Sequence, residues 1–180
     1  QVRLASASDE LGFSAFYAAS SGSFGDVNGA EAFLSNPAGA ISTLSTTHLV
    51  LSLRTEGGGE IFPTQPFPAP WNTGSVNNLA ARYVGYIHVP SAGTRTFGVN
   101  SDDGCRLRLN IVVVAEYPPP RAPAVTTGTY NFPAAGSYPV RLDWYENGGG
   151  DIVQFFQVNP GGTQRLVNDG SEATVTPMAM

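Results

Sequence analysis

The chain has 180 residues, 42% hydrophobic content and a formal net charge of −5, and arginine supplies all nine of its basic residues. This length suits one domain with a substantial core, so we expect a single domain over residues 1–180. The scattered arginines offer neither a nucleic-acid groove nor a membrane-binding patch, which leaves cations or neutral polar molecules as the expected ligands.

No apolar run approaches the roughly 18 residues that cross a bilayer, so membrane insertion is not expected. The start of the chain, Gln1 to Leu4, lacks the apolar centre of a signal peptide. This fits a chain that begins after processing or within a longer protein. Cys105 is the single cysteine, which excludes an intramolecular disulfide and a cysteine-based zinc site.

Strand-like runs dominate the chain, and one short helix is predicted. The runs are 12–18, 48–53, 79–89, 94–100, 105–110, 111–117, 138–146 and 151–158. The helix is expected at 30–35, with Asn28 as its cap, Glu31 three residues later as in a capping box, and Pro37 ending it. Residues 56–78, rich in glycine and proline, are expected to form a long irregular loop.

Alternation within these runs predicts which side chains face the core. One face of the 138–146 run carries Tyr138, Val140, Leu142 and Trp144. Cys105 is in phase with the apolar residues of its own run, which predicts a buried structural thiol. Many short strands punctuated by glycine and proline favour an all-β fold, an antiparallel β-sandwich with long irregular loops and at most a short helix.

Several blocks, in the same order along the chain, resemble the signature of PA14 domains. They are RYVGYIHVPSAGTRTF at 82–97, SDDGCRL at 101–107, AAGSYPVRL at 134–142 and YENGGGD at 145–151, while GFSAFY at 12–17 is similar to the opening strand. The resemblance is good over 81–158, and residues 1–80 diverge. It implies a β-sandwich of the kind found in secreted adhesins, toxins and glycosidase accessory regions. An extracellular location and other domains of a larger secreted or surface protein are therefore expected.

The same resemblance implies a calcium site. In the lectin members of that family, paired aspartates on one loop and a second, glycine-rich loop bind calcium, which coordinates sugar hydroxyls. By position, the first loop is Asp102-Asp103, with a cis peptide bond between them, and the second is 147–151. The expected ligands of the calcium ion are Asp102, Asp103, Asn147, Gly148, Gly149 and Asp151. Side-chain oxygens and glycine carbonyls are donors that calcium accepts at flexible geometry.

Glycans or free sugars are the ligands that this site would bind, without bond chemistry. Asp102, Asp103 and Asp151 are expected to act in sugar binding as well as in calcium binding. Aromatic faces commonly complete such pockets, and Trp71, Tyr117 and Tyr145 are the candidates. Packing in the core or within a loop explains each of these three aromatic residues equally well.

Alternatives stay open. Asp-Asp-Gly is a common turn and a glycine run can be slack, although their joint occurrence in the family's order favours the calcium site. The chain is alternatively a structural or protein-interaction sandwich with a purely stabilising calcium. A hydrolase would pair Glu146 with Asp102 or Asp151, but a divalent cation holds carboxylates ionised whereas catalysis needs one raised pKa. No motif for acyl or phosphoryl transfer occurs, so a non-enzymatic module is expected.

Overall fold

The computed structural model describes residues 11–178, so the start at Gln1–Leu4 and the outermost parts of the expected 1–180 domain lie outside the described residues. The strands are β1 (Phe13–Ala19), β2 (Ser42–His48), β3 (Ser52–Leu53), β4 (Leu79–Val89), β5 (Gly93–Asp102), β6 (Cys105–Leu109), β7 (Val112–Tyr117), β8 (Ala124–Phe132), β9 (Gly136–Glu146), β10 (Ile152–Val158), β11 (Gln164–Leu166) and β12 (Thr174–Pro177). The helix is α1 (Val27–Ser35).

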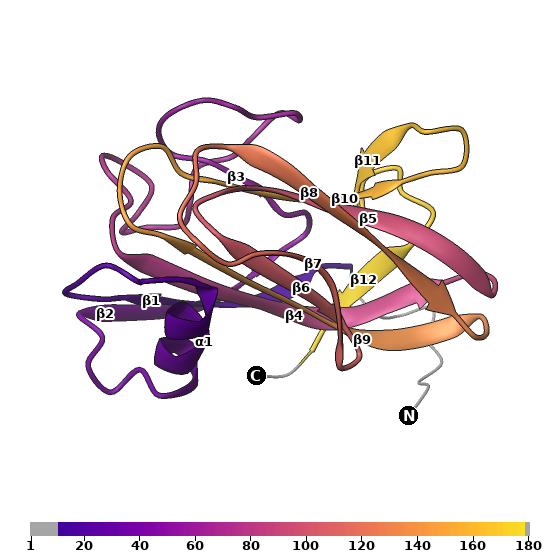
Figure 1. Cartoon of the computed structure of the whole chain (residues 1–180), viewed down its shortest axis with the longest axis horizontal. Helices are drawn as coiled ribbons and strands as arrows, with labels where there is room; N and C mark the ends of the chain where they lie inside the picture. Colours follow the sequence, from indigo (N-terminus) through magenta and orange to yellow (C-terminus); the bar gives the residue numbers. More distant parts are fainter. Residues whose placement is uncertain (1–10, 179–180) are drawn as a thin grey trace.

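The strands form two antiparallel sheets that face each other as a sandwich (Figure 1). The larger sheet has the order β2-β1-β4-β9-β6-β7, and β12 also pairs with β4. The smaller sheet has the order β11-β10-β5-β8, and β3 also pairs with β10. Strands β4 and β9 pair over their full length, from Leu79 opposite Glu146 to Val89 opposite Gly136. The predicted all-β sandwich is confirmed.

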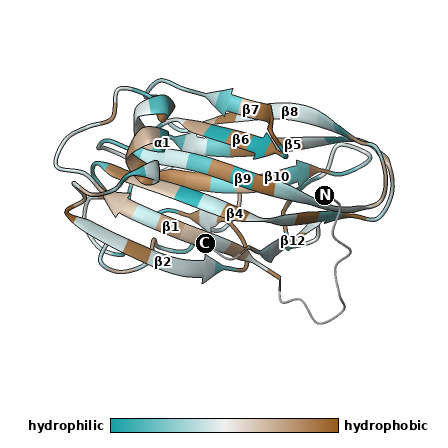
Figure 2. Cartoon of the chain, turned by 90° about the horizontal axis from the view of Figure 1, so that it is seen from below, coloured by the Kyte–Doolittle hydropathy of each residue, from teal (hydrophilic) through white to brown (hydrophobic). Residues whose placement is uncertain are grey.

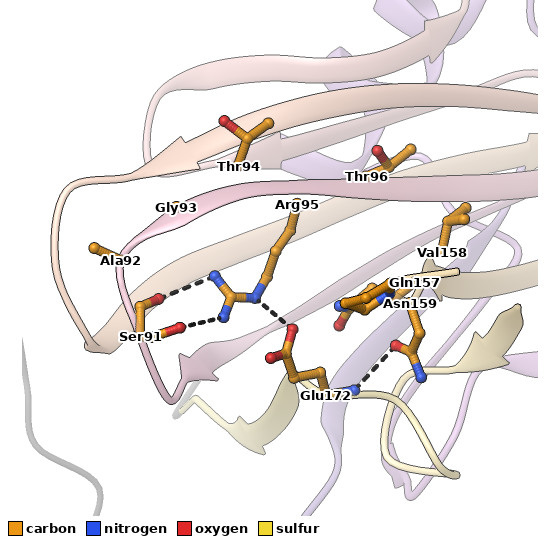
Figure 3. A pocket seen from close by; sticks show the side chains of 11 residues that line it. Ser91, Ala92, Gly93, Thr94, Arg95, Thr96, Gln157, Val158, Asn159 and Glu172 are labelled. Atoms are coloured by element: carbon orange, nitrogen blue, oxygen red, sulfur yellow. Dashed lines mark hydrogen bonds and ion pairs between the residues drawn. The ribbon is translucent and has the colours of Figure 1, made fainter. Parts of the chain in front are cut away.

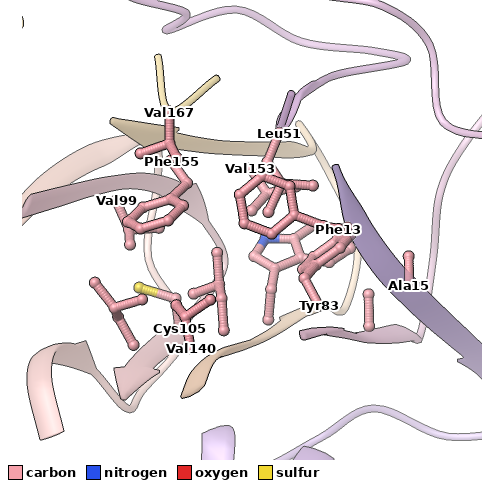
Figure 4. Close-up of a cluster of buried hydrophobic side chains, with 14 of the residues drawn as sticks. Phe13, Ala15, Leu51, Tyr83, Val99, Cys105, Val140, Val153, Phe155 and Val167 are labelled. Atoms are coloured by element: carbon pink, nitrogen blue, oxygen red, sulfur yellow. The ribbon is translucent and has the colours of Figure 1, made fainter. Parts of the chain in front are cut away.

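The core lies between the two sheets. Figure 4 shows Val99, Val153 and Phe155 of the smaller sheet packed toward Cys105 and Val140 of the larger one. The predicted inward set of β9 is confirmed, since all four of its members are buried. Cys105 is also buried and free, as its phase in the sequence indicated.

The helix α1 covers the outer face of the larger sheet (Figure 2). It begins earlier than predicted: Asp26, not Asn28, is the N-cap, and its side chain accepts the backbone N–H of Gly29 at 3.0 Å. Glu31 forms no capping box and instead binds arginines of the sheet. At nine residues, α1 is the only helix within 11–178, and no helix in that range is long and apolar enough to cross a membrane.

The predicted 48–53 strand is wrong in its limits, because β2 ends at His48 and only the two-residue β3 falls later in that run. Strands β2, β8, β11 and β12 were not predicted. The first two are rich in Ser and Thr and alternate between half-buried and exposed positions, so they lack the apolar pattern of a core strand. Residues 56–78 contain no strand or helix apart from a single bridge at Gln65, as expected for an irregular loop.

Strand direction brings three loops to one end of the sandwich. Strands β5 and β9 both end there, at Asp102 and Glu146. The loop 56–78, the segment between β7 and β8, and the glycine-rich turn 147–151 reach the same end (Figure 1).

Candidate metal and ligand-binding site

Three carboxylates meet where β5 and β9 end. Asp102, Asp103 and Glu146 each offer an oxygen, and these oxygens all lie within 4.8 Å of one another. All three residues are buried, with exposed fractions of 6%, 6% and 0%. Buried carboxylates are rare unless they are paired or bind a cation, so this group could hold a metal ion.

Hydrogen bonds to its backbone and close packing at Gly104 hold the turn that carries the two aspartates. The peptide bond between Asp102 and Asp103 is cis, as the resemblance implies. The indole N–H of Trp144 donates to the carbonyl of Asp102 at 2.9 Å, and the N–H of Asp103 donates to the carbonyl of Tyr145 at 3.0 Å. At Gly104, a Cβ would approach the Tyr145 ring to 2.6 Å, so the turn closes only with glycine there.

The three carboxylates differ in their hydrogen-bond partners. Asp103 accepts the backbone N–H of Arg121 and of Asn147, each at 3.0 Å. One oxygen of Glu146, Oε1, accepts the N–H of Gly148, but its buried Oε2 has no hydrogen-bond partner among residues 11–178. The Asp102 carboxylate likewise accepts no hydrogen bond within that range. Asp102 and Glu146 therefore each have a carboxylate oxygen without a hydrogen-bond partner in the described range, and the two carboxylates lie close together.

Burial and mutual repulsion raise the pKa values of this group. The pKa of Glu146 rises to about 9, first because the side chain is desolvated and then because Asp103 and Asp102 are near. Burial followed by the charges of Asp103 and Asp151 brings the pKa of Asp102 to about 7, and burial also raises the pKa of Asp103. Without a cation, the cluster holds protons at neutral pH, whereas a bound cation would keep it ionised.

Asp151 lies beside this cluster rather than in it. Its two oxygens accept the backbone N–H groups of Thr55 at 2.5 Å and Glu56 at 3.1 Å. Burial raises its pKa to about 6. Asp151 therefore anchors the start of the long loop, and its role as a direct metal ligand stays a prediction.

Asn147 also differs from the expected arrangement. Its side-chain amide binds both backbone groups of Phe24, accepting the N–H at 2.6 Å and donating to the carbonyl at 3.0 Å. The contact of Asn147 with the cluster comes from its backbone N–H. Gly148 and Gly149 are exposed at this turn, and Gly149 has a φ of 106°. Their carbonyls remain candidate donors, while the Asn147 side chain is engaged elsewhere.

The three aromatic candidates differ in their exposure to solvent. Trp71 is 8% exposed and packs on Tyr17 at a centroid distance of 5.7 Å, inside the main core. Tyr145 is fully buried against α1, and its hydroxyl donates to the Pro118 carbonyl at 3.0 Å. Neither ring has a face open to a sugar. Tyr117, 37% exposed, is the aromatic side chain of the three that a ligand can reach.

Glu146 was not predicted as a candidate metal ligand, and Arg121 was not predicted as a support of the aspartate turn. Glu146 is in phase with the inward-facing Trp144, and an acidic residue at a core position was the signal that could have indicated it. The Arg121 guanidinium binds the carbonyl of Ser101 at 3.2 Å and its hydroxyl at 2.7 Å, and it lies 4.4 Å from the Tyr117 ring centroid. It holds the segment before Asp102 against the loop after β7.

The donor set fits a hard cation. Every candidate donor is an oxygen, from carboxylates or glycine carbonyls, and calcium takes roughly six to eight such ligands. The free Oε2 of Glu146 is an orphaned buried acceptor that a cation would satisfy. The cluster is thus chemically suited to a divalent metal ion.

The PA14 domain family model matches residues 71–171, which is more than half of the chain. No curated protein matches. Among solved structures, the PA14 domain of the antifreeze protein MpAFP has a TM-score of 0.68 and 17% identity, covering 98% of this chain and 96% of that chain. A PA14 sugar-binding domain from an RTX adhesin has a TM-score of 0.68 and 20% identity, covering 93% and 99%.

A further similar structure is the A domain of epithelial adhesin 9 from Candida glabrata in complex with Galβ1-4GlcNAc. It has a TM-score of 0.63 and 14% identity, covering 98% of this chain and 94% of that chain. At these identities the structural similarity shows the fold, and the family match covers both the aspartate turn and the glycine-rich turn. The chain belongs to the PA14 domain family.

Proposed function

We propose that the chain is a calcium-dependent carbohydrate-binding module, of lectin or adhesin type, that acts outside the cell. The observation that carries the proposal is the buried cluster of Asp102, Asp103 and Glu146, in which one Glu146 oxygen has no partner within 11–178. A bound calcium would offer open coordination positions to vicinal sugar hydroxyls. The sugar-binding and glycan-bound structures of the same fold support this ligand class.

Each residue of the site would have its own role in binding the ion or the sugar. Asp102 and Glu146 would bind the ion with their free oxygens, and Asp103 would bind it while holding the neighbouring loops through two backbone N–H groups. Gly148 and Gly149 would add carbonyl oxygens from the exposed turn. Among the aromatic candidates, Tyr117 would contact the sugar. Three carboxylates gathered at one point suit a cation better than the flanking pair that glycoside hydrolysis requires.

A stabilising metal is the second candidate function. Asp103 already joins two loops, so an ion here would rigidify the same loops in a structural or protein-interaction module. Other domains of a larger secreted or surface protein would then be the partners.

Glycan-array binding with calcium and again with excess chelator, beside thermal melts in both conditions, tests the proposal. We expect a chelator-sensitive glycan signal and a melting temperature raised by calcium. The variant Glu146→Gln should lose both, and the exposed Asp169→Asn serves as a matched control that keeps both. A calcium-raised melting temperature without any glycan signal would overturn the lectin proposal and favour the stabilising metal.

A further inference from the structure

A polar cavity lies at the other end of the sandwich from the acidic cluster. It has a volume of about 410 Å³ and is lined chiefly by Ser91, Thr94, Arg95, Thr96, Gln157 and Glu172. Strand β10 stops at Val158 opposite Thr96, whereas β5 extends to Gly93 and pairs there with β8. The cavity occupies the notch left beside this unpaired stretch of β5.

A buried arginine forms one wall of the cavity. Arg95 is 7% exposed and is held by Glu172 at 3.1 Å, by the Ser91 carbonyl at 3.0 Å and by the Ser91 hydroxyl at 3.1 Å (Figure 3). Three of its five N–H groups are used by these contacts, which leaves two for a ligand. The ion pair with Glu172 already balances the charge of Arg95.

Gln157 supplies an independent indication of a ligand. It is fully buried, and its Oε1 accepts the backbone N–H of Ala173 at 2.8 Å, which fixes the orientation of the amide. Its Nε2 is buried and has no hydrogen-bond partner among the residues that the structure describes. Unpaired buried donors are rare and costly, so an oxygen from outside the chain would satisfy a group that the fold leaves open.

We propose that this cavity binds a neutral polyhydroxyl molecule of monosaccharide size, without a metal ion. Hydroxyl oxygens would accept from Arg95 and Gln157, and a hydroxyl proton would be donated to Glu172, since a hydroxyl is both donor and acceptor. The volume falls in the range of about 300–1,000 Å³ that is usual for small-ligand pockets. A neutral ligand is favoured over an anion because Glu172 already neutralises Arg95 and the chain carries a net charge of −5.

This second site is separate from the proposed calcium site. Asp102 lies seven positions after Arg95 along β5, which places them roughly 23 Å apart at about 3.3 Å per residue. Metal removal should therefore leave the cavity intact, and the inference does not rest on the proposed function.

Amide NMR titration of the full chain in excess chelator tests the inference. The probes are D-glucose, D-galactose and D-mannose, with D-glucuronate as the anionic counterpart. We expect shifts at Gly93–Thr96 and Val158–Asn159 with at least one neutral sugar. Ala92→Trp, at an exposed lining position, should block these shifts, and Ala38→Trp, in an exposed turn elsewhere, should retain them.

A second variant tests the role of the unpaired donor. Gln157→Met removes the amide at similar volume and should weaken binding by about tenfold, the loss of one hydrogen bond. Because Gln157 is buried, its replacement also perturbs the fold. Thr96→Val, which replaces a hydroxyl in the cavity lining, is a milder test of the same site. Absence of shifts with every neutral sugar, or equal shifts in Ala92→Trp, would overturn the inference. Shifts with D-glucuronate alone would overturn the neutral ligand class.

Discussion

The backbone N–H of Asn147 donates to Oδ2 of Asp103 across 3.0 Å, which joins the loop after β9 to the turn after β5. The other oxygen, Oδ1, accepts the N–H of Arg121 from the loop after β7. One buried carboxylate therefore ties three segments of the chain together whether or not a metal ion is bound. The residues that would hold the ion are positioned by the contacts that close this end of the sandwich.

Asp103→Ala should lower the free energy of unfolding by about 2 kcal/mol, even in chelator, because two backbone N–H groups lose their acceptor. It should also abolish the stabilisation by calcium. Urea unfolding with and without calcium measures both effects. Asp169→Ala, an exposed acid, is the control and should change neither. Unchanged stability of Asp103→Ala in chelator would contradict the role of this carboxylate as a tie between loops.

Glu146→Gln should act in opposite directions with and without metal. In chelator the melting temperature should rise by about 2–4 °C, which corresponds to about 1 kcal/mol, because a buried acid with raised pKa and an unpaired oxygen is removed. The amide can keep the hydrogen bond from Gly148. In calcium the variant should gain nothing from the ion. Differential scanning calorimetry separates the two results, and an equal response of both proteins to calcium would exclude Glu146 as a ligand.

The three acids with raised pKa values should make the metal-free protein lose stability as the pH rises from about 5 to about 9. They outnumber His48, whose pKa burial lowers to about 4 and which opposes them below about pH 6.5. Acids with raised pKa bind protons more tightly in the folded state, so their contribution is present below the unfolded pKa and is lost through the folded one. The folded pKa values are about 6 for Asp151, about 7 for Asp102 and about 9 for Glu146. Saturating calcium should flatten this decline. Urea titrations across the range, with and without chelator, measure it.

The contribution of Glu31 to the pH dependence of stability falls at a lower pH, outside the range of about 5 to about 9. Burial works to raise its pKa, but the hydrogen bond and charge of Arg108 and the charge of Arg106 bring it to about 2. An acid with a lowered pKa contributes stability above its unfolded pKa, and this contribution is lost as the pH falls toward 2. A metal-free protein whose stability increased between about pH 5 and about pH 9 would contradict the assignment of raised pKa values to the acidic cluster.

The sequence was informative where one physical signal dominated. Strand β9 could be predicted because its apolar residues alternate strictly, and the aspartate turn was indicated by neighbouring motifs in family order. Strand β8 could not, since its Thr-rich pattern is half-buried on one face and exposed on the other. Local pattern carries little information about such a strand.

Long-range partners explain the differences at the site. The Asn147 amide was expected to face the ion, but it binds Phe24, which is 123 positions away. Asp151 was expected to do the same, and it binds the backbone at Thr55, 96 positions away. Neither partner has a motif that marks it. Glu146 did carry a local signal, its phase with Trp144, because a carboxylate at a core position needs a proton or a cation.

Asp143→Ala should destabilise the fold more than the loss of an exposed ion-pair partner. Asp143 is fully buried and contacts Arg82 at 2.7 Å, Arg141 at 2.5 Å and Arg108 at 3.3 Å. Removing it leaves Arg82 without a carboxylate partner, whereas Arg108 and Arg141 keep Glu31, so the loss should be about 2–3 kcal/mol. Glu116→Ala, which removes a partly exposed partner of Arg106, should cost less than about 1 kcal/mol. Urea unfolding compares the two, and similar losses would show that burial does not set the cost here.

Gln154→Ala should release the long loop without unfolding the sandwich. The Gln154 side chain is fully buried; its Oε1 accepts from Ile61 and Asn100, and its Nε2 donates to Ser52 and Phe62. These contacts hold residues 61–62 against β10.

Removing the amide leaves the loop groups unsatisfied, so local opening should become easier and global stability should fall by about 2 kcal/mol. Limited proteolysis with mass spectrometry should find cleavage within 56–70 at much lower protease concentration than in the unmodified chain. Gln164→Ala, at an exposed position of β11, should leave the cleavage pattern unchanged. Cleavage elsewhere first would indicate that other contacts, such as those of Asp151 with Thr55 and Glu56, hold the loop instead.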